Sequence, residues 1–405
     1  MSEWVEKRLG EILRLTKGIS YSSSDYSATN QGTVFITLKC FAKNGGFSKR
    51  GIKYYNGTVP ERLLLKTGDL LIANTDVTRD GDIVGCPVYV PELEGTMPIT
   101  MSMDVSRLDF IEGTEVNKHF LYYVMMTKKV RDFMKERSSG STVLHLKTSA
   151  VPDLKIKIPA DTAEQTRIAK ILSTVDAAIE QTEVLIAKYG RIRAGLMQDL
   201  LTRGIDELQK VALGQLADVS SGITLGKKHE GLDTVKLPYL RVANVQDGYL
   251  DLRETTHIRI PISQVERYKL QYGDVLMNEG GDFDKLGRGT VWRDEVPNCL
   301  HQNHVFRVRC NKELLLPDYL ALVSASPYGK SFFVLNSKQS TNLASINSTQ
   351  LKSFPIPLPD IEGQKRLINI FGKKAKALTA HQQQLSKLQT LKKGLMQDLL
   401  SGPRE

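Results

Sequence analysis

Residues 195–201 read Gly-Leu-Met-Gln-Asp-Leu-Leu, and the same seven residues return unchanged at 394–400. A seven-residue identity at this distance is very improbable by chance. Each copy ends a long stretch with helical periodicity, and each stretch follows a larger segment of mixed character. The chain therefore consists of one unit used twice, which predicts two bodies, each followed by a long helix.

The repeat also predicts where these parts begin and end. We expect a first body at residues 1–158, a long helix at 159–204, a second body at 205–358 and a second long helix at 359–405. Pro159 and Pro359 precede the two helices, and Gly204 and Gly402 follow them, as is typical of helix starts and stops. About 38 residues at ~1.5 Å each give a rod of roughly 55 Å.

Apolar residues in both helical stretches recur three and four positions apart, which is the pattern of a coiled coil with a widened apolar face. The residues expected to pack are Ile168, Ile171, Val175, Leu185, Tyr189, Ile192 and Leu196 in the first helix, and Leu367, Ile370, Leu388, Leu391 and Leu395 in the second. If the two seams bury each other, the helices must run antiparallel. The chain is then nearly cyclic, with a pseudo-two-fold axis across the helices.

The bodies repeat more faintly than the helices. Leu9-Gly10 parallels Leu213-Gly214, and Gly68-Asp69 parallels Gly273-Asp274. Between such anchors lie short apolar runs separated by Gly, Asn and Asp, which indicate strands and turns. The expected fold class is α+β: two similar mixed α/β domains, dominated by strands, separated by two long antiparallel helices.

Composition limits the other possibilities. The chain has 405 residues, 41% of them apolar, and a net charge of +10, about half of which falls in the second long helix. With no apolar leader and no membrane-length run, we expect a cytoplasmic protein with no membrane contact. Four cysteines without regular spacing are interpreted as reduced thiols rather than zinc ligands or disulfides. We expect no metal and no cofactor.

The motifs of an enzyme are missing from the sequence. A DNA amino-methyltransferase needs a glycine-rich cofactor loop and an Asn/Asp-Pro-Pro-aromatic motif, and neither occurs. The stretch 221–228 is similar to a phosphate-binding loop, but its first glycine is misplaced and the hydroxyl residue after lysine is missing. Asp153-Leu154-Lys155 matches only the short end of a nuclease motif. The chain alone is therefore expected to have no catalytic residues.

The helix starts, helix ends and body openings together resemble the specificity subunits of type I restriction–modification enzymes. The residues that carry the resemblance are Pro159 with Gln165-Thr166-Arg167-Ile168, Pro359 with Gln364-Lys365-Arg366-Leu367, the two heptapeptides, Leu9-Gly10 and Leu213-Gly214. It covers essentially the whole chain. The second helix start departs slightly, because Glu164-Gln165 becomes Gly363-Gln364 with one residue deleted.

The resemblance implies a set of partners and a function. Each body would be a target recognition domain that binds double-stranded DNA, and the helices would form an antiparallel coiled coil that docks two methyltransferase (modification) subunits. Restriction/translocase subunits would join in the full complex. The chain would be the non-catalytic, sequence-specific subunit of a restriction endonuclease and adenine-N6 DNA methyltransferase complex.

Base contacts do not follow from the resemblance, so we chose candidates by chemistry. Arg and Lys read guanine, Asn and Gln read adenine, and flexible loops can enter a groove. The candidate DNA-binding residues are Lys39, Lys43, Asn44, Lys49, Arg50, Asn74, Thr75, Arg79, Ser141 and Lys147 in the first body, and Arg241, Asn244, Lys285, Arg288, Gln302, Asn303, Lys338 and Asn342 in the second. Any one of their loops could equally be a solvated turn.

Two dissimilar bodies on a rod predict an asymmetric, two-part DNA site with an unread spacer. Each body would contact one half-site in the major groove, and the helix pair would set the spacer length. The lysines and arginines of 359–405 have two interpretations: a solvated helix face, or contact with DNA or a partner. The alternative function is a protein-binding scaffold with two recognition heads.

Overall fold

The structure, a computed structural model of the chain, describes residues 3–27, 29, 31–43, 45–78, 80–93, 95, 97–203, 208–224, 233–281, 286–339 and 344–402. The chain divides into two compact units. Unit 1 comprises residues 1–182 and 384–405, and unit 2 comprises residues 183–383. In the described part of the chain, none of the helices combines the length and apolar character needed to cross a membrane.

Unit 1 is a strand-rich body with three short α-helices. Its strands are β1 (Trp4–Arg8), β2 (Leu13–Lys17), β3 (Thr33–Ile36), β4 (Lys53–Tyr55), β5 (Leu70–Ala73), β6 (Thr75–Asp76), β7 (Pro87–Tyr89), β8 (Ile99–Met101), β9 (Val105–Phe110), β10 (Ser138–Ser139), β11 (Leu144–Leu146) and β12 (Lys155–Pro159). The helices are α1 (Leu9–Ile12), α2 (Lys118–Met125) and α3 (Lys128–Glu136).

Among the described residues, unit 2 has the corresponding strands in the same order as unit 1, together with two more short α-helices. Its strands are β13 (Lys210–Ala212), β14 (Ala217–Ser221), β15 (Thr234–Leu240), β16 (Thr256–Pro261), β17 (Val275–Asn278), β18 (Gly280–Gly281), β19 (Gly289–Val291), β20 (Leu300–His301), β21 (Val305–Cys310), β22 (Lys338–Gln339), β23 (Ala344–Ser345) and β24 (Pro355–Pro357). Its short helices are α5 (Leu213–Leu216), α6 (Val265–Tyr268), α7 (Pro317–Ala325), α8 (Pro327–Asn336) and α9 (Ser348–Lys352).

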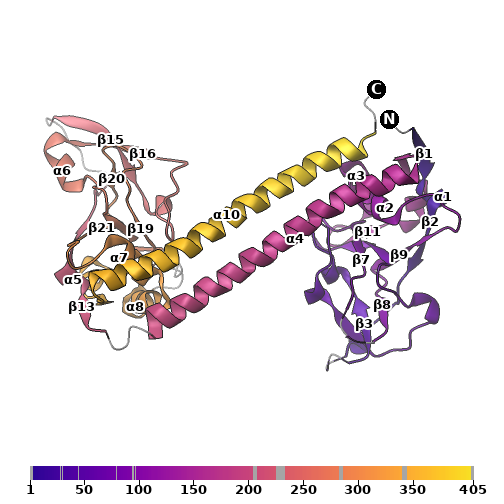
Figure 1. Cartoon of the computed structure of the whole chain (residues 1–405), viewed down its shortest axis with the longest axis horizontal. Coiled ribbons are helices and arrows are strands. Elements are labelled where there is room, and N and C mark those ends of the chain that lie inside the picture. The colour runs from indigo at the N-terminus through magenta and orange to yellow at the C-terminus, as the bar shows by residue number, and fades with distance from the viewer. Residues whose placement is uncertain are drawn as a thin grey trace. The chain divides into compact units, whose positions relative to one another are not determined.

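The sheets of the two units have identical strand orders. The central sheet is β2-β9-β5-β7 in unit 1 and β14-β21-β17-β19 in unit 2. The second sheet is β4-β3-β8 in unit 1 and β16-β15-β20 in unit 2, and the third is β10-β11-β6 in unit 1 and β22-β23-β18 in unit 2. The two-stranded sheet β1-β12 of unit 1 corresponds to β13-β24 of unit 2. The predicted α+β fold with a doubled body is confirmed (Figure 1).

The strand register defines which residues of the two units correspond. In unit 1 Ile36 pairs with Met101, and at the equivalent position of unit 2 Leu240 pairs with His301. By the same registers, Asn74 corresponds to Glu279 and Asp104 to His304, and in both pairs the first residue donates its backbone N–H to the carbonyl of the second. Corresponding positions can therefore hold very different side chains on the same backbone.

A repeated glycine marks a point of close backbone contact in each unit. A Cβ atom on Gly18 would lie 2.3 Å from the carbonyl oxygen of Ser102, and one on Gly222 would lie 2.0 Å from that of His301. Both distances are far inside van der Waals contact, so only glycine fits. The recurrence of glycine before isoleucine, as Gly18-Ile19 and Gly222-Ile223, therefore has a steric cause.

The two long helices are α4 (Thr162–Gln198) and α10 (Ile361–Leu400), and each begins in one unit and ends in the other. Within unit 1 they run antiparallel, because Ile168 shares a cluster with Leu400 while Asp176 forms an ion pair of 2.6 Å with Lys392. Within unit 2, Tyr189 packs on the ring of His381. Figure 1 shows both helices along their whole length.

The packed seam is not the one expected at three positions. Leu185, Ile370 and Leu391 are 37%, 39% and 50% exposed, so their predicted burial between the helices was wrong. Buried or half-buried residues instead follow the heptad Ile168, Leu172, Val175, Ile179, Thr182, Ile186 and Tyr189 in α4, and Phe371, Lys374, Leu378, His381, Leu385, Leu388, Lys392, Leu395 and Leu399 in α10.

The first turns of each long helix explain why the packed face is rotated from the predicted one. Ile168, Ala169 and Leu172 belong to the core of unit 1, and Phe371 belongs to the core of unit 2. A helix that must bury this face against its body cannot also turn Leu185 or Ile370 toward its partner. Of the other predicted seam residues, Ile168 is buried, and the rest are half-buried: Ile171, Val175, Tyr189, Ile192, Leu196, Leu367, Leu388 and Leu395.

The repeated heptapeptides complete the cores of the two units. Leu196, Met197 and Leu201, at the end of the helix that began in unit 1, pack into the core of unit 2. Leu395, Met396, Leu399 and Leu400, at the end of the helix that began in unit 2, pack into the core of unit 1. Each unit therefore needs the far end of the other unit's helix. The C-terminal end also lies beside the first strand, since a Cβ on Gly402 would be 3.4 Å from the Trp4 ring.

A buried glutamine anchors the start of each long helix. The Gln165 side chain accepts a hydrogen bond from the backbone N–H of Asn117 at 2.7 Å and donates to the Pro159 carbonyl at 2.8 Å. Gln364 accepts from Leu316 N–H at 2.8 Å and donates to the Pro359 carbonyl at 3.0 Å. These bonds satisfy buried backbone groups. They fix α4 to the residue that precedes α2, and α10 to the residue that precedes α7.

We expect Leu201→Ala to destabilise unit 2 by about 2–5 kcal/mol, because Leu201 is fully buried in that core. The loss should fall on unit 2 even though the helix that carries Leu201 starts in unit 1. Hydrogen exchange measured by mass spectrometry on the full chain would show faster exchange in β17 and β21. The matched variant Leu400→Ala should speed exchange in β5 and β9 instead. Equal effects of both variants on both units would contradict the core assignment.

Candidate nucleic-acid interface

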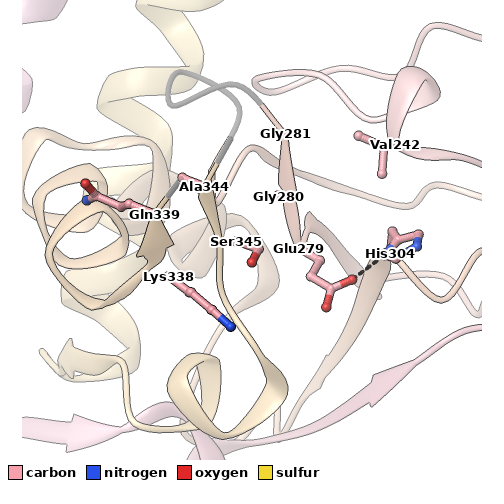
Figure 2. A pocket seen from close by; sticks show the side chains of 9 residues that line it. All are labelled: Val242, Glu279, Gly280, Gly281, His304, Lys338, Gln339, Ala344 and Ser345. Carbon is pink, nitrogen blue, oxygen red and sulfur yellow. Dashed lines mark hydrogen bonds and ion pairs between the residues drawn. The ribbon is translucent and has the colours of Figure 1, made fainter. Parts of the chain in front are cut away.

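Four loops of unit 2 meet at one pocket of about 530 Å³. It is lined by Val242, Glu279, Gly280, Gly281, His304, Lys338, Gln339, Ala344 and Ser345. Apart from Ala344 and Ser345 of β23, these residues come from, or directly adjoin, the four loops that the sequence suggested in this body: 241–248, 278–288, 301–303 and 338–342. The structure thus brings together loops that lie far apart in the chain (Figure 2).

The pocket carries opposite charges on its two sides. Figure 2 shows Glu279 hydrogen-bonded to His304 on one side and Lys338 and Gln339 on the other. Lys338 is exposed, and the His304 side chain is more than half exposed. A surface that presents a carboxylate, a cation and an amide can match the mixed donors and acceptors of a base edge.

The other candidates of unit 2 lie at or near this pocket. Gln302 and Asn303 are half-buried next to His304, and the Asn303 amide nitrogen is 3.4 Å from the His304 ring. Half-buried Arg241 precedes Val242, and its Nε is buried without a hydrogen-bond partner among the described residues. Half-buried Arg288 donates to the Gln246 side chain at 3.1 Å. Lys285 and Asn342 lie outside the described residues.

The prediction that Asn244 contacts DNA was wrong, because its side chain is only 3% exposed. Its amide donates to the carbonyls of Asp251 at 2.8 Å and Glu254 at 2.9 Å. Its side-chain oxygen accepts from the backbone N–H of Arg241 at 2.9 Å. All of this bonding capacity is spent on holding the turn in shape, so Asn244 positions the loop and does not read a base.

In unit 1 most candidate cations gather on one short hairpin. Phe41 and Phe47 form an antiparallel bridge, and the flanking 3₁₀ turns Leu38–Cys40 and Lys49–Gly51 bracket it. We call residues 39–50 the cationic hairpin, because its exposed side chains are those of Lys39, Lys43, Lys49 and Arg50.

One member of the cationic hairpin is paired within unit 1. Lys43 lies 2.9 Å from Asp82, and this contact raises the pKa of its ammonium group. The side chain is still 64% exposed, so the lysine can reach an external phosphate. Asn44 lies outside the described residues.

Two further candidates of unit 1 were wrong because they are buried. Asn74 is 4% exposed and donates to the Met103 carbonyl at 3.2 Å. Thr75 is 5% exposed and donates to the Asp104 carboxylate at 3.2 Å. Both lie where β5 passes into β6, and their polar groups face inward to fix that bend.

The remaining candidates of unit 1 lie on exposed loops. Ser141 and Lys147 are exposed on and just after the β10–β11 hairpin, and Arg79 lies outside the described residues. Buried Asp76 accepts hydrogen bonds from the backbone N–H groups of Thr78, Ile83 and Val84. Burial raises the pKa of this carboxyl, but hydrogen bonds from Thr78, Ile83 and Val84 lower it further, so the net shift is downward.

Sequence reasoning missed several residues that line the pocket. Glu279, His304, Gln339 and Ser345 were not singled out, although all but Ser345 adjoin or lie in a loop that was. Cations and amides are the usual residue types of base and phosphate contacts, and an acid is not. His301, which lies in one of those loops, is fully buried, and burial lowers its pKa to about 4, so it stays neutral and faces no phosphate.

The structure offers no sign of a metal centre among the residues it describes. They contain no group of three or more His, Cys, Asp or Glu side chains placed to hold an ion. All four cysteines are free and buried, and burial raises the pKa of Cys40 to about 11 and that of Cys310 to about 12. Thiols held in this state are poor metal ligands and weak nucleophiles.

Comparison with known families gives a match to both halves of the chain. The family model of the type I restriction modification DNA specificity domain matches residues 1–188 and 205–390. The chain is similar to the type I restriction enzyme EcoBI specificity subunit of Escherichia coli, with 22% identity over 90% of this chain and 78% of that one. It is also 22% identical to the EcoKI specificity subunit of Escherichia coli strain K12, over 62% of this chain and 56% of that one.

Solved structures show the same fold. The S subunit of a type I restriction-modification system from M. genitalium superposes with a TM-score of 0.61 at 14% sequence identity, covering 100% of this chain and 97% of that one. A chain from a study of complex assembly and conformational transition in the type I R-M system gives a TM-score of 0.52 at 17% identity, covering 98% of each chain.

We expect His301 to make the chain less stable in acid. The folded pKa of about 4 lies below the ordinary value of 6.5, so folding favours the neutral ring. Its contribution is fully present above pH 6.5 and is lost as the pH falls from 6.5 toward 4, by about 3 kcal/mol. Chemical denaturation between these pH values would measure this loss.

The matched variant is His301→Met, which installs the residue that unit 1 has at the corresponding position. It removes a hydrogen bond to the Val305 carbonyl, so it should cost about 1 kcal/mol at neutral pH. The loss of stability between pH 6.5 and 4 should be smaller in this variant. An unchanged pH dependence would show that another group controls it.

Proposed function

The chain belongs to the family of type I restriction modification DNA specificity domains and carries that domain twice. We propose that each unit reads one half of an asymmetric, two-part DNA site. Loops of both units would contact base edges in the major groove. The chain itself would supply no catalytic group and would act as the recognition subunit of a restriction–modification complex.

The observation that carries this proposal is a shared backbone with different side chains on its loops. The strand orders of the two units are identical, yet Asn74 and Asp104 in unit 1 correspond to Glu279 and His304 in unit 2. Base pairs are distinguished by the pattern of donors and acceptors that they present in the major groove. Two heads with different patterns on one scaffold suit two different half-sites.

Backbone contacts would come from the exposed cations. The cationic hairpin of unit 1 and Lys338 of unit 2 are placed on the loops that carry the candidate readers. Lys and Arg contacts to phosphates supply most of the affinity and its salt dependence without sequence information. The exposed lysines of α10, Lys365, Lys373, Lys376, Lys387 and Lys393, remain candidates for contact with DNA or a partner.

The long helices would set the spacer and hold the partner subunits. Helices of 37 and 40 residues are roughly 55–60 Å long, against about 34–36 Å for one turn of B-DNA. Both helices expose apolar side chains, with Val184 at 59% and Leu391 at 50%. Exposed apolar residues on a helix favour contact with another protein. We propose that two modification subunits dock there, and that restriction/translocase subunits join the assembled complex.

The salt dependence of binding to a random-sequence duplex tests the proposed function. Because the cationic hairpin would contact phosphates, the double variant Lys49→Ala/Arg50→Ala should lower the slope of log K against log salt by about 1–2. Fluorescence anisotropy of the full chain at several salt concentrations measures the slope. Lys66→Ala, at an exposed lysine before β5 and outside the cationic hairpin, is the matched control and should have little effect. No affinity for DNA at any salt would favour the scaffold alternative.

The length of the helices should determine the spacer. Matched insertion of four residues into α4 and α10 adds one helical turn, or ~6 Å. At about 3.4 Å per base pair, the spacer should lengthen by one or two base pairs with both half-sites unchanged. Sites selected from a random duplex library would report the spacing. An insertion into α4 alone is the control and should disrupt the seam. Unchanged spacing in the doubly extended chain would refute the role of the helices as a ruler.

A further inference from the structure

We propose that Glu279, oriented by His304, reads the exocyclic amino group of a cytosine at one position of the half-site bound by unit 2. This inference rests on the proposed function, because it requires that unit 2 contacts DNA. It names an acidic residue as a specificity determinant, in a pocket that also contains Lys338 and Gln339.

The position of Glu279 is fixed by its backbone. Its N–H donates to the His304 carbonyl at 3.0 Å, and its own carbonyl accepts from the N–H of Ile346 at 2.8 Å. The residue therefore lies locked between β21 and the segment after β23. A side chain on a fixed backbone can be aimed with the precision that base recognition requires.

One of the two oxygens of the Glu279 carboxylate is hydrogen-bonded within the described part of unit 2, and the other is not. Oε2 is hydrogen-bonded to Nδ1 of His304, while Oε1 has no hydrogen-bond partner among the described residues. The Glu279 side chain is 29% exposed and lies in the wall of the pocket. His304 thus engages one carboxylate oxygen and leaves the other able to accept a hydrogen bond from a bound ligand (Figure 2).

A carboxylate at this place is unsuited to the DNA backbone. It would repel phosphates, so it gains only from a partner that donates hydrogen bonds. In the major groove guanine presents the acceptors N7 and O6, and thymine presents the acceptor O4. Cytosine presents only its N4 amino group, whereas adenine places the acceptor N7 beside its N6 amino group. Cytosine is therefore the base edge that suits this carboxylate best.

Small residues give a base edge access to Glu279. The strands beside it contribute Gly280, Gly281, Ala344 and Ser345, and Gly281 has a φ of 142° that favours glycine. The corresponding residues of unit 1 are larger: Thr75, Asp76, Leu144 and His145. The space beside the carboxylate is thus specific to the sequence of unit 2 and does not follow from the shared fold.

Unit 1 places its own acid differently. Asp104, which corresponds to His304, accepts hydrogen bonds from Thr75 at 3.2 Å and from the Tyr21 hydroxyl at 3.4 Å. Its two oxygens are thus already engaged, and the corresponding partner position is filled by buried Asn74. We infer that the carboxylate readout belongs to unit 2 alone, so the two half-sites should differ at the base that Glu279 contacts.

The test is selection of bound duplexes from a random library by the full chain, comparing wild type with Glu279→Gln. A glutamine amide both donates and accepts, so it tolerates other bases. Preference for cytosine at one position of one half-site should fall about 10-fold to about 100-fold. The other half-site should be unchanged. Glu313→Gln, an exposed acid on the turn before α7, is the matched control and should keep the wild-type preferences.

Other results would overturn the inference and leave the proposed function standing. These are unchanged preference in Glu279→Gln, loss of preference for adenine rather than cytosine, or a uniform change in affinity at all sequences. If wild type itself selected no sequence in either half-site, the proposed function would fail instead.

His304 is a positioning residue, and a second pair of variants tests its role. His304→Ala should weaken the same cytosine preference, because the carboxylate then loses its orienting donor. His304→Asn keeps a side-chain donor and should restore much of the preference. Equal loss in both variants, or loss at other positions of the half-site, would show that His304 acts through the fold and not through Glu279. Thermal melting of each variant would show whether it remains folded.

Discussion

The ends of the two long helices are the constraint on which the rest of the structure depends. Met197 of α4 and Leu201, which lies just after α4, are buried in the core of unit 2, and Leu400 of α10 is buried in the core of unit 1. Since burial of large apolar side chains contributes most of a core's stability, neither unit is complete without the helix that starts in the other. The identical heptapeptides are explained by this reciprocal packing, because they fill equivalent places in two equivalent cores.

The scaffold separates stability from recognition. Buried glutamines, close-packed glycines and the helix ends occur in both units, and they serve the same structural role in each. The pocket loops carry the differences, such as Glu279 where unit 1 has Asn74. Loops can change their side chains at little cost to the core, since they are held by a small number of buried polar groups. Under the proposed function, a chain built in this way would vary each half of its DNA site independently.

Much of the fold could be predicted from the sequence, since a long repeat and heptad periodicity are strong signals. The face on which the helices pack could not be predicted. Each long helix has two adjacent columns of apolar residues, and only packing against the body determines which column faces the partner helix. Ile370 and Phe371 are neighbours in sequence, yet only Phe371 is buried.

Site residues were harder to predict than the fold. Asn74, Thr75 and Asn244 have the residue types of base readers, but they hold turns, and residue type alone does not separate the two roles. In unit 2, all four loops that the sequence suggested contribute to or adjoin one pocket, which the sequence did not predict. Glu279 and His304 escaped notice because their pairing depends on strands that are distant in the sequence.

The most direct test of the account is the sequence that the wild-type chain selects from a random duplex library. Two heads with different loops on one helix pair should select two short, dissimilar motifs separated by a spacer of constant length and no sequence preference. A single continuous motif, a palindrome or a spacer of variable length would contradict the central claim that the two units read two unlike half-sites.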